Sequence, residues 1–456
     1  MKQLKYFVYW FIFSGIILIN GCGKHDAPET TISEAPPESS SVSPSEILSE
    51  TPSETIHFEV SSPTIPGRVY LYTTVGFGID YRDAEIVVES KSGSLERQTI
   101  QIKLRGNSSV NAPKQSYNIK FSKKVSLLGM EPEKKWSFLG NPYEKTLLRA
   151  SLAFDYAAAI GIPYTSQNRI CQVWVNDEYV GTCVAVEPVN VKKNRVDINI
   201  DAGDFLVERN RNREEVGITY INTDSGMRFE INEPESPDSA TVNECLRILN
   251  EIETAVQTLD HNIYEDYIDI DSFINFYIFH ELVKDIDFGE FSTRYFVKKG
   301  KLYAGPPWDF DLSFGNVATD VEEEKFQIYH NIEGFGDASE DSSHGFWAQK
   351  DYYKWLCQDD YFMDKVRLRW QYLFPLTENL AWDNELGESW ITRQISAYGD
   401  ILESNYTTDG ANWPIDVAFS IFEMQTPASS YSENVTILQQ WLKDRITWLD
   451  EQFRLQ

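Results

Sequence analysis

Cysteine and histidine are scarce in this chain of 456 residues, which has five cysteines and six histidines. No Cys-x-x-Cys pair or Cys/His spacing occurs, so the sequence does not indicate a zinc site. Cys171 and Cys183 flank Asn176-Asp177 on two expected strands. With a two-residue turn, Cys171 faces Thr182 and the other thiol points to the opposite face, so we expect no disulfide. A three-residue turn would instead place the two cysteines across from each other.

Basic residues are also few, with 41 lysines and arginines against 70 aspartates and glutamates, for a formal net charge of −29. Nucleic acid is therefore not an expected partner, because its phosphates would be repelled. An acidic surface is compatible with divalent cations or basic proteins, although most of this charge serves solubility. We expect a monomer.

Long apolar runs are missing except near the N-terminus, where one extends from Phe7 to Ile19 behind Lys2 and Lys5. It ends at Gly21-Cys22, the order of a signal peptide, and the final cysteine resembles a lipobox. We therefore predict a lipoprotein signal peptide over residues 1–22. Lipidation of Cys22 would then anchor the chain to the outer face of a bacterial cell membrane. An uncleaved transmembrane anchor is the alternative.

Residues 23–55 are dominated by Pro, Ser, Glu and Thr, and such a segment buries too little apolar surface to fold. We predict a disordered tether there, followed by a folded domain over 56–375 and a helical extension over 376–456 that packs on it. Alternating apolar and β-branched residues predict the strands, and helical spacing of apolar residues predicts the helices. The expected strands are 57–60, 69–72, 84–88, 97–105, 116–121, 169–175, 179–186, 205–209, 228–231, 294–298 and 301–304, and the expected helices are 145–160, 239–259 and 271–283.

The order of these elements, strands first and helices later, predicts an α+β fold with a sheet-rich front half and a helical back half. No internal repeat is present.

One cluster of interest joins Arg105-Gly106-Asn107-Ser108-Ser109 to a strand that carries Lys114 and Lys120. A small-residue loop with free backbone N–H groups can cradle phosphate, and a strand-borne lysine can neutralise it. A polar turn with solvated lysines explains the same composition.

A second cluster places Asp287 five positions before Ser292, in a loop between an expected helix and a hairpin. Protein kinases use an Asp followed five residues later by an Asn, where the Asp accepts the hydroxyl proton and the Asn holds a metal ion. An acidic loop that caps the helix is the alternative.

The third cluster places Asp309 and Asp311 in an aromatic run, Trp308 to Phe314. Carboxylates between Trp and Phe need a partner, and an extended segment would put both on one face. Two hard oxygen ligands at one point suit Mg²⁺ or Mn²⁺. Loop capping or pairing with arginines is the alternative.

Taken in order, these motifs resemble the signature of the CotH family of secreted protein kinases, over roughly residues 65 to 375. The resemblance implies a two-lobed, atypical kinase-like body that transfers phosphate from ATP to protein Ser or Thr with a divalent metal. The motifs are RGNSS (105–109), PKQSYNIKF (113–121), KTLLRASLAFDYAAAIGIPY (145–164), VWVNDEYVGTCVAVEPV (173–189), KDIDFGEFST (284–293), KKGKLYAGP (298–306) and WDFDLSFGN (308–316).

The same resemblance implies roles for single residues. Asp287 would be the catalytic aspartate, and Asp309 or Asp311 would bind metal. Arg105 and one of Lys114 and Lys120 would contact the nucleotide phosphates.

Glu187 matches an acidic family position, and it would pair with that lysine or line the nucleotide pocket. Ser292 stands where many members have Asn, and a hydroxyl is a weaker metal ligand. Ala150 likewise replaces a common Asn.

The expected substrate is a secreted, cell-wall or spore-coat protein. A catalytically inactive kinase-fold scaffold or adhesin is the main rival, and Ser292 is the feature in its favour. A carbohydrate-active lipoprotein with paired carboxylates is another, but it leaves the N-terminal cluster unexplained.

Overall fold

The computed structural model describes residues 66–106, 108–317, 343–407, 413–420, 423–424 and 426–455. The predicted signal peptide, Cys22, the tether and the strand expected at 57–60 lie outside these ranges. The strands are β1 (Gly67–Tyr72), β2 (Arg82–Glu89), β3 (Leu95–Arg105), β4 (Ser116–Val125), β5 (Glu133–Leu139), β6 (Asn168–Val175), β7 (Glu178–Val186), β8 (Phe205–Arg209), β9 (Thr219–Asn222), β10 (Arg228–Glu233), β11 (Arg294–Lys298) and β12 (Lys301–Ala304). The helices are α2 (Arg149–Ala159), α3 (Ser239–Gln257), α4 (His261–Tyr264), α5 (Ile270–Val283), α7 (Tyr353–Leu356), α8 (Asp360–Glu378), α9 (Trp390–Thr407) and α10 (Tyr431–Phe453), with 3₁₀ turns η2 (Ser108–Asn111) and η3 (Ile200–Ala202).

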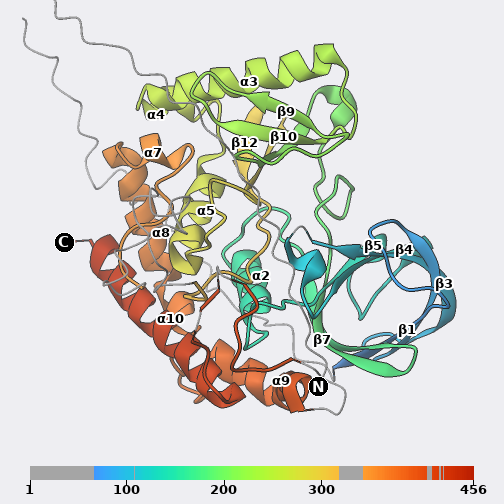
Figure 1. The fold of residues 1–456 in the computed structure, drawn as a ribbon. Coiled ribbons are helices and arrows are strands. Elements are labelled where there is room, and N and C mark those ends of the chain that lie inside the picture. The colour runs from blue at the N-terminus through green and yellow to red at the C-terminus, as the bar shows by residue number, and fades with distance from the viewer. Residues whose placement is uncertain are drawn as a thin grey trace, which may run out of the picture. The chain divides into compact units, whose positions relative to one another are not determined.

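The first seven strands close into a barrel in the order β1-β2-β3-β4-β5-β7-β6, blue to green in Figure 1. Successive side chains on a strand point alternately into the barrel and out to solvent. Val69 and Leu71 are fully buried in its interior, whereas Lys120 is exposed. A parallel pairing of β1 with β6 closes the barrel, and its other pairings are antiparallel. The α+β class is confirmed, but this topology does not confirm the two-lobed, kinase-like arrangement that the resemblance implies.

The β6–β7 hairpin corrects one prediction. Its turn has the two expected residues, Asn176 and Asp177, but the register shifts between Val173 and Trp174. This irregularity places Cys171 directly opposite Cys183, not opposite Thr182. The absence of a disulfide is nevertheless as predicted, because both cysteines are free and buried in the barrel.

A second sheet of five strands has the order β12-β11-β8-β10-β9. One face, with Val207 and Phe229, belongs to the main core, to which α3 and α5 also contribute. Leu206 and Phe296 cover the other face in a small separate cluster. Figure 1 shows α3 running along β9 and β10.

Helix α5 crosses the main core, and each residue from Ser272 to Val283 is buried. Asp269 begins it, because its carboxylate accepts a 2.9 Å hydrogen bond from the Ser272 backbone N–H. Lys284 ends it in the left-handed conformation, with φ 47°. A helix that is apolar on all sides is held by packing, and it fixes the loop that follows.

Three long helices follow in the C-terminal part, and α10 packs against both α5 and α8 (Figure 1). On α10, Leu438, Leu442 and Leu449 are at most 1% exposed and lie in the main core. No helix within the described ranges combines the length and hydropathy that a membrane span needs.

Candidate functional site

A cavity of about 310 Å³ brings together residues from the barrel, the second sheet and the loops after α5 and β12. Five of the predicted site residues line it: Arg105, Asp287, Ser292, Asp309 and Asp311. The barrel contributes the end of β3, the start of β4 and the segment after β5, while the second sheet contributes the end of β8 and the loop beyond it. The other lining residues are Gly106, Ser109, Ser116, Leu139, Asn141, Pro142, Tyr143, Glu208, Arg209, Asn210, Arg213, Glu215, Glu230, Phe291, Arg294, Trp308 and Leu312.

Backbone hydrogen bonds hold the two acidic clusters side by side. The Ile286 N–H donates to the Leu312 carbonyl at 3.4 Å, and the Phe314 N–H donates to the Val283 carbonyl at 2.7 Å. These bonds run from the end of α5 to the segment that carries Asp311. The loop after the helix is therefore held against the Trp308–Phe314 segment by backbone hydrogen bonds.

Ser292 and Asp309 are in direct contact, because the Ser292 hydroxyl donates to Asp309 Oδ2 at 3.3 Å. Both residues have left-handed backbones, with φ 53° and φ 72°. Such values are uncommon outside glycine and often occur where a site demands a fixed side-chain direction. Ser292, which follows Asp287 by five residues, therefore lies beside the Asp309 carboxylate.

The carboxylates repel one another. Burial and the nearby Asp309 raise the pKa of Asp287 to about 7. Burial, Asp309 and Asp287 also raise the pKa of Asp311 well above its usual range. Crowded acids of this kind favour a bound cation or a shared proton.

Two cations stack on one aromatic ring of the cavity. The Arg105 guanidinium lies 5.1 Å from the Trp308 ring centre, and Arg294 lies 5.6 Å from the same centre. Arg294 also pairs with Glu208 at 2.6 Å. Burial lowers the pKa of Arg105, and the carboxylates of Asp309 and Asp311 act in the opposite direction. The guanidinium of Arg105 therefore lies beside the acidic cluster.

The other predicted nucleotide contacts do not line this cavity. Lys114 is buried and donates from Nζ to the Thr182 carbonyl at 2.5 Å. Lys120 is exposed on the barrel. Glu187 pairs with Arg195 at 2.5 Å, and neither expected lysine is its partner.

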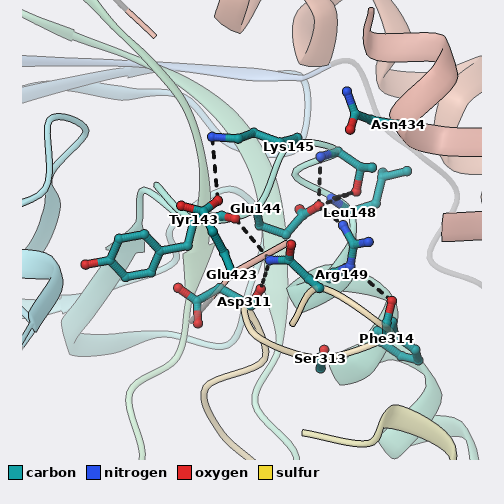
Figure 2. A network of polar contacts seen from close by, with 12 residues as sticks. Tyr143, Glu144, Lys145, Leu148, Arg149, Asp311, Ser313, Phe314, Glu423 and Asn434 are labelled. Carbon is teal, nitrogen blue, oxygen red and sulfur yellow. Dashed lines mark hydrogen bonds and ion pairs between the residues drawn. The ribbon is translucent and has the colours of Figure 1, made fainter. Parts of the chain in front are cut away.

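Figure 2 shows a network of polar contacts that includes Tyr143 and Asp311, two residues that also line the cavity. Arg149 pairs with Glu144 at 2.5 Å and donates to the Phe314 carbonyl at 3.4 Å. Lys145 lies 3.6 Å from Glu423. These contacts tie the segment before α2 to the chain just beyond Asp311.

The donor chemistry of the cavity fits a hard divalent cation, since carboxylate oxygens converge there. Among the described residues, however, no group of three or more His, Cys, Asp or Glu side chains is close enough to hold a metal ion. Mg²⁺ commonly keeps several waters and shares protein carboxylates with substrate phosphates. Asp309, Asp311 and Ser292 are therefore better suited to bind a metal ion together with water and substrate phosphate than to enclose it alone.

Sequence reasoning missed the second-sheet wall of the cavity, which includes Glu208 and Arg213. A signal was present, because arginines alternate at positions 209, 211 and 213 directly after a strand. No pattern in the sequence, however, showed that this strand lies beside the loop after α5.

A family model described as CotH kinase protein matches residues 102–449, which is most of the chain. No curated protein matches the chain.

Proposed function

Because the chain belongs to the CotH kinase family, we propose that it transfers the γ-phosphate of ATP to Ser or Thr hydroxyls of a protein. The observation that carries this proposal is the cavity in which Asp287, Asp309, Asp311 and Arg105 meet. Carboxylates for an acceptor proton and for metal, with a cation for phosphate, are the groups that phosphoryl transfer requires.

In this mechanism Asp287 orients the acceptor hydroxyl and takes its proton. Its raised pKa, about 7, suits a group that must both accept and release a proton near neutral pH. Asp309 and Asp311, with Ser292, would hold Mg²⁺ or Mn²⁺, which neutralises phosphate charge when bound. Arg105 contacts phosphate oxygens from the barrel side.

The first prediction concerns Asp287. Protein lacking residues 1–55 should transfer radiolabelled phosphate from ATP with Mn²⁺ or Mg²⁺ to itself or to basic acceptor proteins. The substitution Asp287→Asn should lower the rate about 10²- to 10⁴-fold, because it removes the proton acceptor. Full activity in this variant, with the fold intact by circular dichroism, would contradict the assignment.

We also propose that the protein is anchored outside the cell membrane through lipid on Cys22, and that its substrate is a secreted, cell-wall or spore-coat protein. The support is the apolar run that ends at Gly21-Cys22. Labelled palmitate should enter the intact protein and not a Cys22→Ala variant.

An inactive scaffold is the second candidate, and Ser292 favours it because a hydroxyl is a weak metal ligand. ATP with metal should raise the unfolding temperature of a kinase, since a ligand that binds only the folded state stabilises it. A scaffold without a nucleotide site would show no such shift.

A further inference from the structure

The positive charge that lines this cavity is carried by arginine. Among the described residues that line it, the cations are Arg105, Arg209, Arg213 and Arg294, and none is a lysine. Two of the four pair with carboxylates, although Nη1 of Arg294 has no hydrogen-bond partner among the described residues. Arg209 pairs with Asp351 at 2.7 Å, and Arg294 pairs with Glu208 at 2.6 Å.

Arg105 and Arg213 keep their guanidinium donors free of hydrogen bonds to the described residues. Each instead lies over an aromatic ring of the cavity: Arg213 is 4.8 Å from the centre of Phe291, as Arg105 is 5.1 Å from that of Trp308. An arginine stacked on a ring keeps its edge donors available and points them in a fixed direction.

The backbone around Arg213 is fixed. Its N–H donates to Asn210 Oδ1 at 2.8 Å, and its carbonyl accepts from Arg228 Nη1 at 3.0 Å. The neighbouring Glu214 pairs with Arg228. The loop between β8 and β9 therefore presents this side chain from an anchored position.

The two free arginines serve different carboxylates. Arg105 lies near Asp309 and Asp311, the acids assigned to metal. Asp287 has its pKa raised to about 7 by burial and by Asp309, and the Arg213 guanidinium acts in the opposite direction. Of the cavity-lining cations without a paired carboxylate, Arg213 is the one that acts on Asp287, the residue to which the acceptor proton would pass.

We propose that Arg213 contacts the γ-phosphoryl group during its transfer, a role that rests on the proposed function. In this step the bond between the γ-phosphorus and the β,γ-bridging oxygen breaks, and a bond from the acceptor oxygen to the γ-phosphorus forms. The acceptor proton passes to Asp287, and ADP leaves with the electron pair of the broken bond. Negative charge on the γ-oxygens is then met by a guanidinium, which can donate two parallel hydrogen bonds to phosphate.

The test uses Arg213→Ala, Arg213→Lys and a matched control, Arg211→Ala. Arg211 lies two positions away in the same loop, is paired with Glu290 at 3.5 Å and does not line the cavity. Arg213→Ala should lower kcat about 100-fold, the scale for losing one preorganised donor. Arg213→Lys should recover part of that loss, and Arg211→Ala should keep wild-type kcat.

Binding supplies a second readout. With Mn²⁺ present, Arg213→Ala should lose part of the stabilisation by ATP and keep that by ADP, because only ATP has the γ-phosphate. Equal loss for both nucleotides, or a changed acceptor KM with unchanged kcat, would overturn the assignment and place Arg213 elsewhere on the substrates. If the wild-type protein neither binds ATP nor transfers phosphate, the proposed function itself is wrong, and the role of Arg213 is wrong with it.

Discussion

Ser292 stands at the position where the resemblance to the kinase family predicts Asn, and in the structure it contacts another predicted site residue. Among the described residues, its hydroxyl donates a hydrogen bond to Asp309, at 3.3 Å. An asparagine at this position would offer a carbonyl oxygen, a better ligand for a hard cation. The left-handed backbone, φ 53°, also suits asparagine, which tolerates this region better than most residues.

We therefore predict that Ser292→Asn tightens Mn²⁺ binding by roughly tenfold, the scale on which altered metal-site partners act. The measurement is the Mn²⁺ concentration that gives half-maximal stabilisation with ATP. Ser292→Ala should weaken binding, and equal affinities in all three proteins would show that this position does not contact metal.

At this scale three predicted carboxylates and Arg105 line the cavity, whereas the two predicted lysines do not. Asp309 and Asp311 were visible because charged residues inside an aromatic run need an explanation. Lys114, which precedes β4, and Lys120, which lies on it, were chosen only by their position in a motif, and a motif does not say where a side chain points. Lys114 turns into the protein and binds a carbonyl, whereas Lys120 lies on the outside of the barrel.

Helix α10 is connected through buried contacts to the loop that carries Asp287. Arg445 on this helix pairs with Glu281 on α5 at 2.8 Å, and both side chains are fully buried. Glu281 also accepts from the backbone N–H groups of Trp347 and Ala348, each at 2.8 Å. The Trp347 indole donates to the Asp285 carbonyl at 2.6 Å, two residues before Asp287.

Replacing Arg445 with Met should cost about 3–5 kcal/mol of stability, because Glu281 would be left buried without its counter-ion. Urea unfolding followed by circular dichroism measures this change. The double variant with Glu281→Gln should recover part of it.

Arg454→Ala on the same helix is the control, since Arg454 is 70% exposed and its pair with Asp450 should contribute at most about 1 kcal/mol. If Arg445→Met unfolds at the same urea concentration as this control, the buried pair does not support the loop.

The type of an element was easier to predict from the sequence than the register between paired strands. The alternation of Arg169 to Val186 predicted a hairpin with a two-residue turn. A register shift after Val173, however, places Cys183 and not Thr182 opposite Cys171. Such an irregularity leaves no period-two signature, because it adds one residue on one strand only. Strand β5 was missed for a related reason: Glu133-Lys134-Lys135 begins it without apolar alternation.

For the whole molecule, the boundary expected at residue 375 divides a continuous core. Leu442 and Ile446 of α10 are 1% exposed in the same cluster as α5 and α8. On the barrel side, Thr182 of β7 donates from its N–H to Asn405 of α9 at 2.9 Å. The last helices are thus part of the body that holds the cavity.

A chain that ends at residue 375 should therefore show no cooperative unfolding transition, because it exposes the core face of α5 and α8. A chain that begins at residue 56 and runs to the end should unfold cooperatively and bind ATP with metal. Calorimetry on both separates the cases, and a stable, cooperative short chain would mean that α9 and α10 are an independent addition.

The α+β class was accessible from element order, but barrel closure was not. It depends on a parallel pairing of β1 with β6, whose residues are separated by most of the barrel sequence. Pairings of this kind follow from packing over the entire domain, and local patterns carry no trace of them.

The cavity has a consequence for timing. Arg105 belongs to the barrel, Asp287 lies between β10 and β11, and Asp311 follows β12, so neither the barrel nor the later segments hold a complete set of reactive groups. A chain that crosses a membrane unfolded would carry no working centre during its passage. If the chain is exported unfolded and acts as the proposed kinase, phosphorylation would begin only after the barrel and the later segments have folded together.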